Sequence, residues 1–503
     1  MVLIFYKNNK SHKKTEEKNL IFSIFGNGVV EDVDDLLAKP NECKICYNLN
    51  FKNGALKTGL GFAHLKAPEA EDTPIENWHT FKFADFVSKI DDIWLNRWFN
   101  ANTNKFVYQI WFYEDGTKIL WTVPLIDEFA GEVWQRTVLV KSYPTYVCEY
   151  RIDNEDSTVF FTNEGMVYLT RDTDYTYDAP AMISCLVHYD NFFGITNTNR
   201  NTLIYTTNLN LKEWTDDNSS TIEFLDNRGS FTKLVGFNDY VYLFREHGIT
   251  KLSIYTSKND FSCTHLYTST SKIYEKSVCV CGDKIFFVTR DGLYSFNGNS
   301  VSRVGEKNDK YLRWADNSNC SAVSFNGKYY LATKYDFDDG VAVGAENETD
   351  SVNNVLFEID IDTFDMNIYR GVDIKTLLAV DSPIMSKLCA CYNSTENKNV
   401  IGELTFDGKT FNENTEKLWM SYNTDLGYRG KRKKVKELVI NSLYPCVVGI
   451  ESDEESCEIE IVGDEKEQRV PLNICGKTFQ FTFKTSEQCC DISKPMIVFD
   501  VVQ

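Results

Sequence analysis

Residues that could do chemistry are scattered along this chain, and none of them completes a catalytic motif. The six histidines fall into no HExxH spacing, and no GxSxG nucleophile motif occurs. A zinc site would need a second pair of ligands beside Cys43-x-x-Cys46. Three further close pairs lack that spacing: Cys279 and Cys281, Cys389 and Cys391, Cys489 and Cys490. We therefore interpret the cysteines as small buried side chains and predict no cofactor, no metal and no enzymatic activity.

Paired carboxylates are the residues that a glycoside hydrolase would need, one as acid and the other as base or nucleophile. Candidates on this chain are Asp336, Asp338, Asp339, Asp360 and Asp362. All of them stand in turn-like or strand-end contexts, where acidic residues are common. A glycan-cleaving site therefore stays an alternative to a purely structural role.

A basic run from Arg429 to Lys436 could contact phosphate or an acidic face of a neighbouring subunit. An acidic stretch from Glu451 to Glu460 follows, and this order suits complementary pairing across an assembly. On composition alone, a solvated start of a strand explains the basic run as well. The candidate assembly-interface residues are Arg429, Lys431, Arg432, Lys433 and Lys434.

The net charge argues against one class of partner, nucleic acid that the protein would coat. The 503 residues carry a formal charge of −20, whereas a surface that coats nucleic acid needs lysine and arginine to displace counterions. Acidity could serve solubility alone, or could line a wall past which DNA slides without sticking. The sequence shows no secretory signal and no apolar run of about 18 residues, so we expect no membrane span. Fifteen scattered cysteines fit a reducing cytoplasm.

Repeated hairpins are the elements that must position these residues. Strand-like runs meet at Asp or Asn followed by Gly, which supplies the positive φ of a tight turn. The clearest hairpin spans residues 283–298, and others span 160–169, 238–255 and 322–333. Strand pairs then recur at intervals of roughly 40 to 60 residues, as in propeller blades. By contrast, Glu76 to Phe99 mixes helical and strand spacings and predicts neither element.

The sequence thus predicts an all-β protein with an irregular six- or seven-bladed β-propeller and a C-terminal β-sandwich-like domain. We expect an N-terminal arm and first strands over 1–75, the propeller over 76–411 and the sandwich over 412–503. A pair of sandwiches or a β-solenoid would give similar local patterns.

Three separated segments resemble the β-propeller virion proteins of tailed bacteriophages, a group of tail nozzle, tail-hub and packaged-DNA stabilisation proteins. The opening stretch is Gly28 to Phe62, with Pro40-Asn-Glu42 and Gly54-Ala-Leu-Lys-Thr-Gly59. The middle is Leu234 to Phe244 and Phe286 to Gly298, which is similar to the blade repeats. The end contains Trp419, Thr424-Asp-Leu-Gly427, Lys431-Arg-Lys433, Gly476-Lys-Thr-Phe479 and Lys494-Pro495. The chain departs from the group in its cysteine count and in an acidic insertion from Tyr335 to Asn353.

This resemblance implies a structural protein of the virion, assembled in the bacterial host cytoplasm. It would form a homo-oligomeric ring in the neck or tail, as a nozzle or hub, and contact other neck and tail proteins on the portal or adaptor side. Genome DNA would pass through the lumen during retention and ejection without sequence-specific binding. Two alternatives remain: a carbohydrate-binding or glycan-cleaving β-propeller, and a generic protein-interaction propeller.

Overall fold

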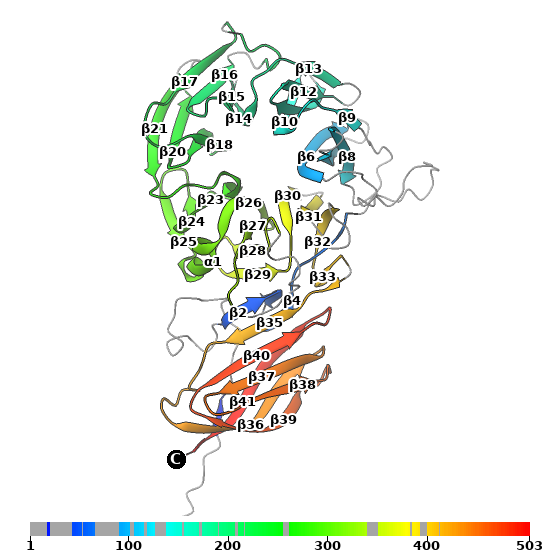
Figure 1. The fold of residues 1–503 in the computed structure, drawn as a ribbon, viewed down its shortest axis with the longest axis vertical. Helices are drawn as coiled ribbons and strands as arrows, with labels where there is room; N and C mark the ends of the chain where they lie inside the picture. Colours follow the sequence, from blue (N-terminus) through cyan, green and yellow to red (C-terminus); the bar gives the residue numbers. More distant parts are fainter. Residues whose placement is uncertain are drawn as a thin grey trace, which may run out of the picture. The chain divides into compact units, whose positions relative to one another are not determined.

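The structure is a computed structural model, and it divides into two compact units (Figure 1). Unit 1 comprises Met1–Gly59 and Glu416–Gln503, and unit 2 comprises Leu60–Thr415. The structure describes residues 18–20, 43–52, 54–65, 90–100, 105–114, 118–125, 137–152, 155–170, 174–189, 191–206, 210–215, 217–254, 261–339, 351–382, 385–392, 400–411 and 413–502.

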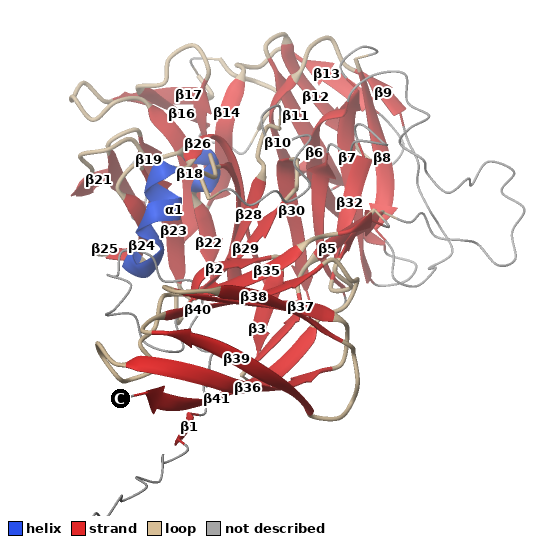
Figure 2. Ribbon diagram, turned by 60° about the horizontal axis from the view of Figure 1, so that its bottom comes forward, coloured by secondary structure: helices blue, strands red, loops and turns tan. Residues whose placement is uncertain are grey.

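Nearly all secondary structure in the described residues is β-strand, which confirms the all-β class (Figure 2). The only α-helix among these residues is α1 (Asp309–Trp314). Two 3-10 turns, η2 (Glu275–Ser277) and η3 (Glu306–Asn308), complete the helical part. Strands dominate because the chain is rich in aromatic side chains, which pack well on pleated surfaces.

Unit 2 contains, in its described residues, seven sheets that follow one another along the chain (Figure 1). Their strands pair antiparallel, except that β33 pairs with β5 in parallel in the seventh sheet. The first sheet is β6 (Ile90–Asn100), β7 (Lys105–Glu114), β8 (Ile119–Leu125) and β9 (Thr137–Leu139). The second is β10 (Pro144–Ile152), β11 (Glu155–Thr162), β12 (Gly165–Leu169) and β13 (Asp174–Tyr177). The third is β14 (Met182–His188), β15 (Asn191–Thr196), β16 (Thr202–Thr206) and β17 (Ser219–Glu223). The fourth is β18 (Phe231–Phe237), β19 (Tyr240–Arg245), β20 (Gly248–Ile254) and β21 (Phe261–Thr268).

The last three sheets continue this order, with one exception. The fifth sheet is β22 (Cys279–Cys281), β23 (Lys284–Thr289), β24 (Gly292–Phe296) and β25 (Val301–Val304). The sixth contains β26 (Asp316–Phe325), β27 (Lys328–Lys334), β28 (Val355–Asp360) and β29 (Met366–Arg370). The seventh is β30 (Ile374–Ser382), β31 (Met385–Tyr392), β32 (Val400–Thr405), β5 (Gly61–His64), β33 (Lys409–Thr410) and β34 (Glu413–Asn414). Here β5 pairs with β32, although β5 precedes the first sheet in the sequence.

The four predicted hairpins are all present, as β11–β12, β19–β20, β23–β24 and β26–β27. Three of their turns use the expected backbone: φ is 118° at Gly165, 124° at Gly292 and 71° at Gly327. The turn of β19–β20 does not, because φ is not positive at Gly248. The ambiguous segment 76–99 resolves in part, because its last ten residues belong to strand β6. Its earlier residues, 76–89, lie outside the described part of the chain.

Neighbouring sheets of unit 2 pack through aromatic side chains. Ring centroids lie 5.5 Å apart for Trp111 and Phe160, which join the first sheet to the second. Four further ring pairs join the sheets from the second to the sixth: Phe161 and Phe192, Phe193 and Phe261, Phe244 and Phe287, Phe286 and Tyr329. Each sheet in this series therefore buries apolar surface against the next.

The seventh sheet contacts both the sixth and the first. The Leu377 N–H donates to the Ser321 hydroxyl of the sixth sheet at 2.9 Å, and the Thr376 hydroxyl donates to the Asp92 carboxylate of the first sheet at 2.7 Å. A single cluster of buried side chains also spans these three sheets and includes Ile110 and Leu388.

Unit 1 contains two sheets built from both ends of the chain. One has the order β3 (Leu49–Lys52), β4 (Ala55–Thr58), β41 (Asp491–Val502), β36 (Arg432–Ser442) and β39 (Gln468–Gly476), with β1 (Lys18–Leu20) also beside β41. The other has the order β2 (Cys43–Tyr47), β35 (Lys417–Ser421), β40 (Phe479–Thr485), β37 (Cys446–Ser452) and β38 (Ser456–Ile461). In β40, Phe479, Phe481 and Phe483 are buried and alternate with less buried residues, as expected for a strand with one apolar face.

The domain boundaries at 75 and 411 remain predictions. Strand pairing divides the predicted N-terminal segment, 1–75, between the two units. Strands β2, β3 and β4 belong to unit 1, whereas β5 belongs to unit 2. The sequence did not predict this division, because these strands pair with strands far along the chain. Turn residues and the alternation of apolar and polar residues report only on local structure.

Candidate assembly surface

The basic run enters β36 through two consecutive turns. The Asp425 carboxylate accepts the Gly427 N–H at 2.8 Å, and the Lys431 N–H donates to the Tyr428 carbonyl at 3.2 Å. Gly427 and Gly430 adopt φ values of 77° and 69°, a conformation that glycine reaches without steric cost. The turns therefore fix where each of the following basic side chains points.

Lys433 points inward, not toward a partner. Its side chain is fully buried, and its ammonium group donates to the carbonyls of Asp425 at 2.8 Å, Tyr428 at 3.1 Å and Lys477. Burial lowers the pKa of Lys433. An ammonium has three N–H donors, so this arrangement satisfies all of them and ties the turn to the β39–β40 connection.

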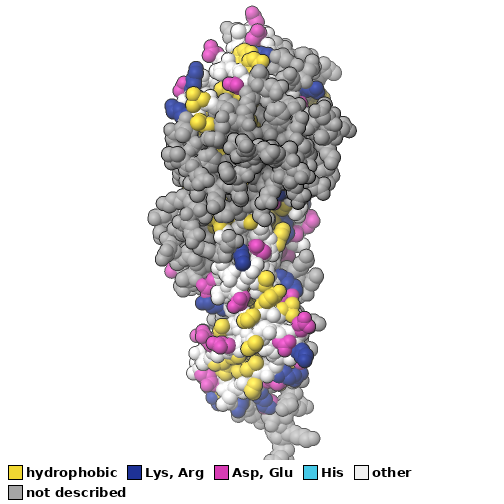
Figure 3. Space-filling model, turned by 90° about the vertical axis from the view of Figure 1, so that its right-hand side faces the viewer, with side chains coloured by type: hydrophobic (Ala, Val, Ile, Leu, Met, Phe, Trp, Pro, Cys, Tyr) yellow, Lys and Arg dark blue, Asp and Glu magenta, His cyan; other side chains and the backbone are white. Residues whose placement is uncertain are grey.

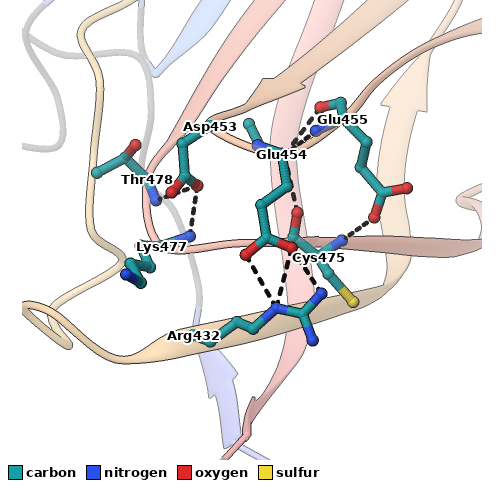
Figure 4. Close-up of polar contacts among 8 residues, drawn as sticks. Arg432, Asp453, Glu454, Glu455, Cys475, Lys477 and Thr478 are labelled. Carbon is teal, nitrogen blue, oxygen red and sulfur yellow. Dashed lines mark hydrogen bonds and ion pairs between the residues drawn. The ribbon is translucent and has the colours of Figure 1, made fainter.

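Arg432 forms an ion pair within its own chain. Its guanidinium holds the Glu454 carboxylate through contacts of 2.6 to 3.0 Å (Figure 4). The hydrogen bond to Glu454 raises the pKa of Arg432. Lys436, which lies further along β36, pairs with Asp500 of β41 at 2.6 Å. Both pairs are partly exposed, so they orient side chains more than they stabilise the fold.

The acidic turn between β37 and β38 binds the neighbouring strands (Figure 4). The Asp453 carboxylate accepts the N–H groups of Lys477 at 2.6 Å and Thr478 at 3.2 Å. Partial burial raises the pKa of Asp453, but these backbone bonds more than offset that effect and lower it. The carboxylate of Glu455 accepts the Cys475 N–H. Part of the acidic stretch thus has a role inside unit 1.

The five predicted interface residues therefore divide into groups. Lys433 is buried, Arg432 is paired with Glu454, Arg429 and Lys431 are exposed, and Lys434 is half-buried. No ion pair joins Arg429, Lys431 or Lys434 to another residue that the structure describes. An assembly role stays a prediction, and it now applies to the exposed residues.

Sequence reasoning found both charged segments but missed their pairing within one chain. In the structure, Glu451 lies opposite Ser456, which places Glu454 in the turn that connects β37 and β38. What the sequence lacked was the position of that turn beside β36. Outward-facing carboxylates that remain exposed on β38 are Glu458 and Glu460.

Apolar side chains also reach the surface of unit 1. Leu443, Tyr444 and Val462 are 42%, 39% and 73% exposed. In the lower part of Figure 3, hydrophobic side chains gather along the middle of one face, and side chains of both charge signs line its margins. An apolar centre with a charged rim is the usual composition of a protein–protein interface.

The candidate catalytic carboxylates Asp339 and Asp360 contact different partners. Asp339 bonds to the buried guanidinium of Arg370 at 3.2 Å. Asp360 accepts the N–H groups of Asp362 at 3.0 Å and Thr363 at 2.9 Å, which forms a turn. Asp336 and Asp338 are exposed. Two of the five carboxylates thus have structural contacts.

In the described part of the chain, no three His, Cys, Asp or Glu side chains come together as a metal site would require. All fifteen cysteines are free thiols. None of the described helices has the length and apolarity to cross a bilayer.

Comparison with known proteins gives little further information. No family model and no curated protein matches this chain. Among solved structures, the extracellular domain of a one-component system from B. thetaiotaomicron is similar at 11% identity, over 91% of this chain and 62% of that one, with a TM-score of 0.41. The extracellular domain of a hybrid two-component system from the same organism is similar at 12% identity, over 68% of this chain and 39% of that one, with a TM-score of 0.37.

A third structure is Hsv2 from Kluyveromyces lactis, with 8% identity, 52% of this chain and 81% of that one covered, and a TM-score of 0.30. The chain therefore spans less than two thirds of both bacterial structures. Since all three TM-scores lie below 0.5, no inference about function rests on these similarities.

Proposed function

We propose that unit 2 is a seven-bladed β-propeller and that unit 1 is a β-sandwich. The observation that carries this proposal is the place of β5, which precedes the first sheet and yet pairs with β32 of the seventh. In a propeller, a strand from the start of the chain completes the last blade and joins the two ends of the ring. The contact between Thr376 of the seventh sheet and Asp92 of the first supports this arrangement.

On this architecture we propose a non-enzymatic structural protein of a tailed-phage virion, part of a ring-shaped neck or tail conduit for genome retention and ejection. Support comes from the order of the motifs, since the opening segment, the repeated hairpins and the C-terminal segment resemble such proteins together. The charge of −20 supports it as well, because an acidic lumen repels the DNA backbone. Arg429 and Lys431 are the exposed cations that a neighbouring copy would contact.

Native mass spectrometry and negative-stain electron microscopy of the full chain test this proposal. We expect closed rings of one stoichiometry, either of the chain alone or on isolated virion tails. Scattered monomers on tail assemblies would contradict it. Portal, terminase and tail genes beside the gene for this protein would support it at little cost.

Charge reversal tests the proposed interface residues. The double variant Arg429→Glu, Lys431→Glu should lower the fraction of chain in rings at least tenfold at micromolar concentration, because like charges across an interface repel. A matched control is Lys276→Glu, Arg290→Glu, which makes the same charge change at exposed positions of unit 2 and should leave the rings intact. Equal effects of both variants would mean that net charge, not this surface, controls assembly.

A carbohydrate-binding or glycan-cleaving propeller is the second candidate. The stacked rings of Tyr168 and Tyr175, with centroids 4.8 Å apart, favour it in one respect, because Tyr175 is 42% exposed and aromatic faces bind sugars. A glycan array probed with the full chain, followed by hydrolysis assays on any hit, tests this candidate. Binding that is lost in Tyr175→Ala but kept in Tyr189→Ala, which removes another exposed tyrosine, would favour it over a conduit role.

A further inference from the structure

Two cysteines from different sheets face each other in unit 2. Cys148 lies on β10 of the second sheet and Cys185 on β14 of the third, and their Sγ atoms are 3.8 Å apart. Cys185 is buried, whereas Cys148 is partly exposed. The Tyr146 hydroxyl donates to the Cys185 carbonyl at 3.0 Å, and this hydrogen bond links β10 to β14 close to the two thiols.

The surroundings keep this pair together. Both thiols belong to an apolar cluster that contains Val159 and Phe161 of the second sheet and Phe192 of the third. Close-packed neighbours leave the two sulfur atoms little freedom to separate. A disulfide requires a bond of about 2.05 Å, so oxidation must bring the two sulfur atoms, now 3.8 Å apart, into bonding distance.

We propose that Cys148 and Cys185 are an oxidisable pair that forms a disulfide between the second and third sheets when the protein meets a thiol oxidant such as a peroxide. Cys148 reacts first because it is the more exposed thiol. The thiol first loses its proton, and the thiolate attacks hydrogen peroxide and breaks the O–O bond, which gives a sulfenic acid and hydroxide. The hydroxide takes up the released proton and forms one water. The Cys185 sulfur then attacks the sulfenic sulfur, which forms the S–S bond and releases a second water. The two thiols lose two electrons, and the peroxide gains them.

Burial supports the order of these steps. It raises the pKa of the Cys185 thiol, and the hydrogen bond with Cys148 raises it further. Cys185 is therefore poorly suited as the first nucleophile and well placed to complete the bond with a neighbour already in contact.

Two other close pairs of cysteines have a less favourable geometry for this reaction. Cys279 and Cys281 lie two residues apart on β22, and Cys389 and Cys391 lie two residues apart on β31. Residues at that spacing have Cα atoms about 6.6 Å apart along a strand, near the limit for a disulfide. The side chains of each such pair lie on the same face of one strand, whereas Cys148 and Cys185 meet from two neighbouring sheets.

Thiol counting and peptide mapping on the full chain test the proposal. Treatment with hydrogen peroxide should lower the thiols titratable after unfolding by two from fifteen. The mass should fall by about 2 Da, and a non-reduced digest should contain one peptide pair joined through Cys148 and Cys185. Cys148→Ser and Cys185→Ser should each remove this peptide pair, whereas Cys389→Ser should keep it.

Thermal unfolding gives a second readout. The oxidised chain should unfold several degrees above the reduced chain, and dithiothreitol should reverse the shift, because the cross-link restricts the unfolded chain. Oxidation of the wild-type chain that joins other cysteines, or that stops at the sulfenic or sulfinic acid of Cys148, would overturn the proposal. Those two results come from the wild-type chain, so they do not depend on whether the serine variants fold.

Discussion

At the residue scale, the basic run shows that a charged side chain can serve the fold. Lys433 is fully buried and binds three backbone carbonyls. Lys433→Met should lower the free energy of unfolding by about 2 to 4 kcal/mol, because it leaves these carbonyls buried without a donor. Urea unfolding measures the change. The matched control is Lys431→Met, which alters an exposed lysine two positions earlier and should cost less than about 0.5 kcal/mol. Equal costs would contradict the structural role of Lys433.

A second residue-scale prediction concerns Asp226, which pairs with the buried guanidinium of Arg245. Burial raises the pKa of Asp226, but hydrogen bonds from the Arg228 N–H and from Arg245 more than offset this and lower it. A carboxylate with a lowered folded pKa stabilises the fold above its unfolded pKa and loses that effect as the pH falls through the folded value. Stability should therefore decline below about pH 4.

Asp226→Asn should remove this part of the acid sensitivity. At pH 7 it should cost about 2 kcal/mol, less than for a fully buried pair, because the carboxylate is 36% exposed. Chemical unfolding at several pH values between 3 and 7 measures both effects. The exposed Asp217→Asn serves as the control and should leave the pH profile unchanged. A variant profile that declines as steeply as the wild type below pH 4 would refute the assignment.

At the element scale, β5 is the strand that pairs with the seventh sheet of unit 2 although it precedes the first sheet in the sequence. A Cβ added to Gly61 would lie 2.0 Å from the carbonyl oxygen of Lys409, a backbone atom that cannot rotate away. Lys409 belongs to β33, so Gly61→Ala should force β33 away from β5, disturb the sheet in which β5 also pairs with β32, and destabilise unit 2 by about 3 kcal/mol. Gly236→Ala is the control, because a Cβ there meets nothing within 4 Å. Hydrogen exchange of β5 and β32 amides reports the effect, and equal protection in both variants would show that β5 tolerates the added atom.

At the scale of the whole molecule, the charge of −20 should keep the protein off duplex DNA. Non-specific binders reach dissociation constants of roughly 10⁻⁴ to 10⁻⁶ M through lysine and arginine contacts to phosphates, and here the acidic excess opposes them. Fluorescence anisotropy with a labelled duplex at about 0.1 M salt should show no saturation up to ~100 μM protein. Saturable binding below about 10 μM would contradict the proposal that DNA passes without adhering.

The sequence by itself determined the local structure of this protein. Turns such as Asp291-Gly292 and Asn326-Gly327 specify a backbone with positive φ, and alternation of apolar residues specifies the buried face. Both signals act within a few residues, so the hairpins and the all-β class followed from them. Only the tertiary structure decided which distant edges pair. It joined β5 to β32 and β4 to β41, buried Lys433, placed Glu454 beside Arg432 and brought Cys148 to Cys185. Such contacts depend on which surfaces meet after the strands have formed. Apart from the Asp425 and Tyr428 carbonyls that Lys433 binds, the partners lie too far apart for a short window of sequence to contain both.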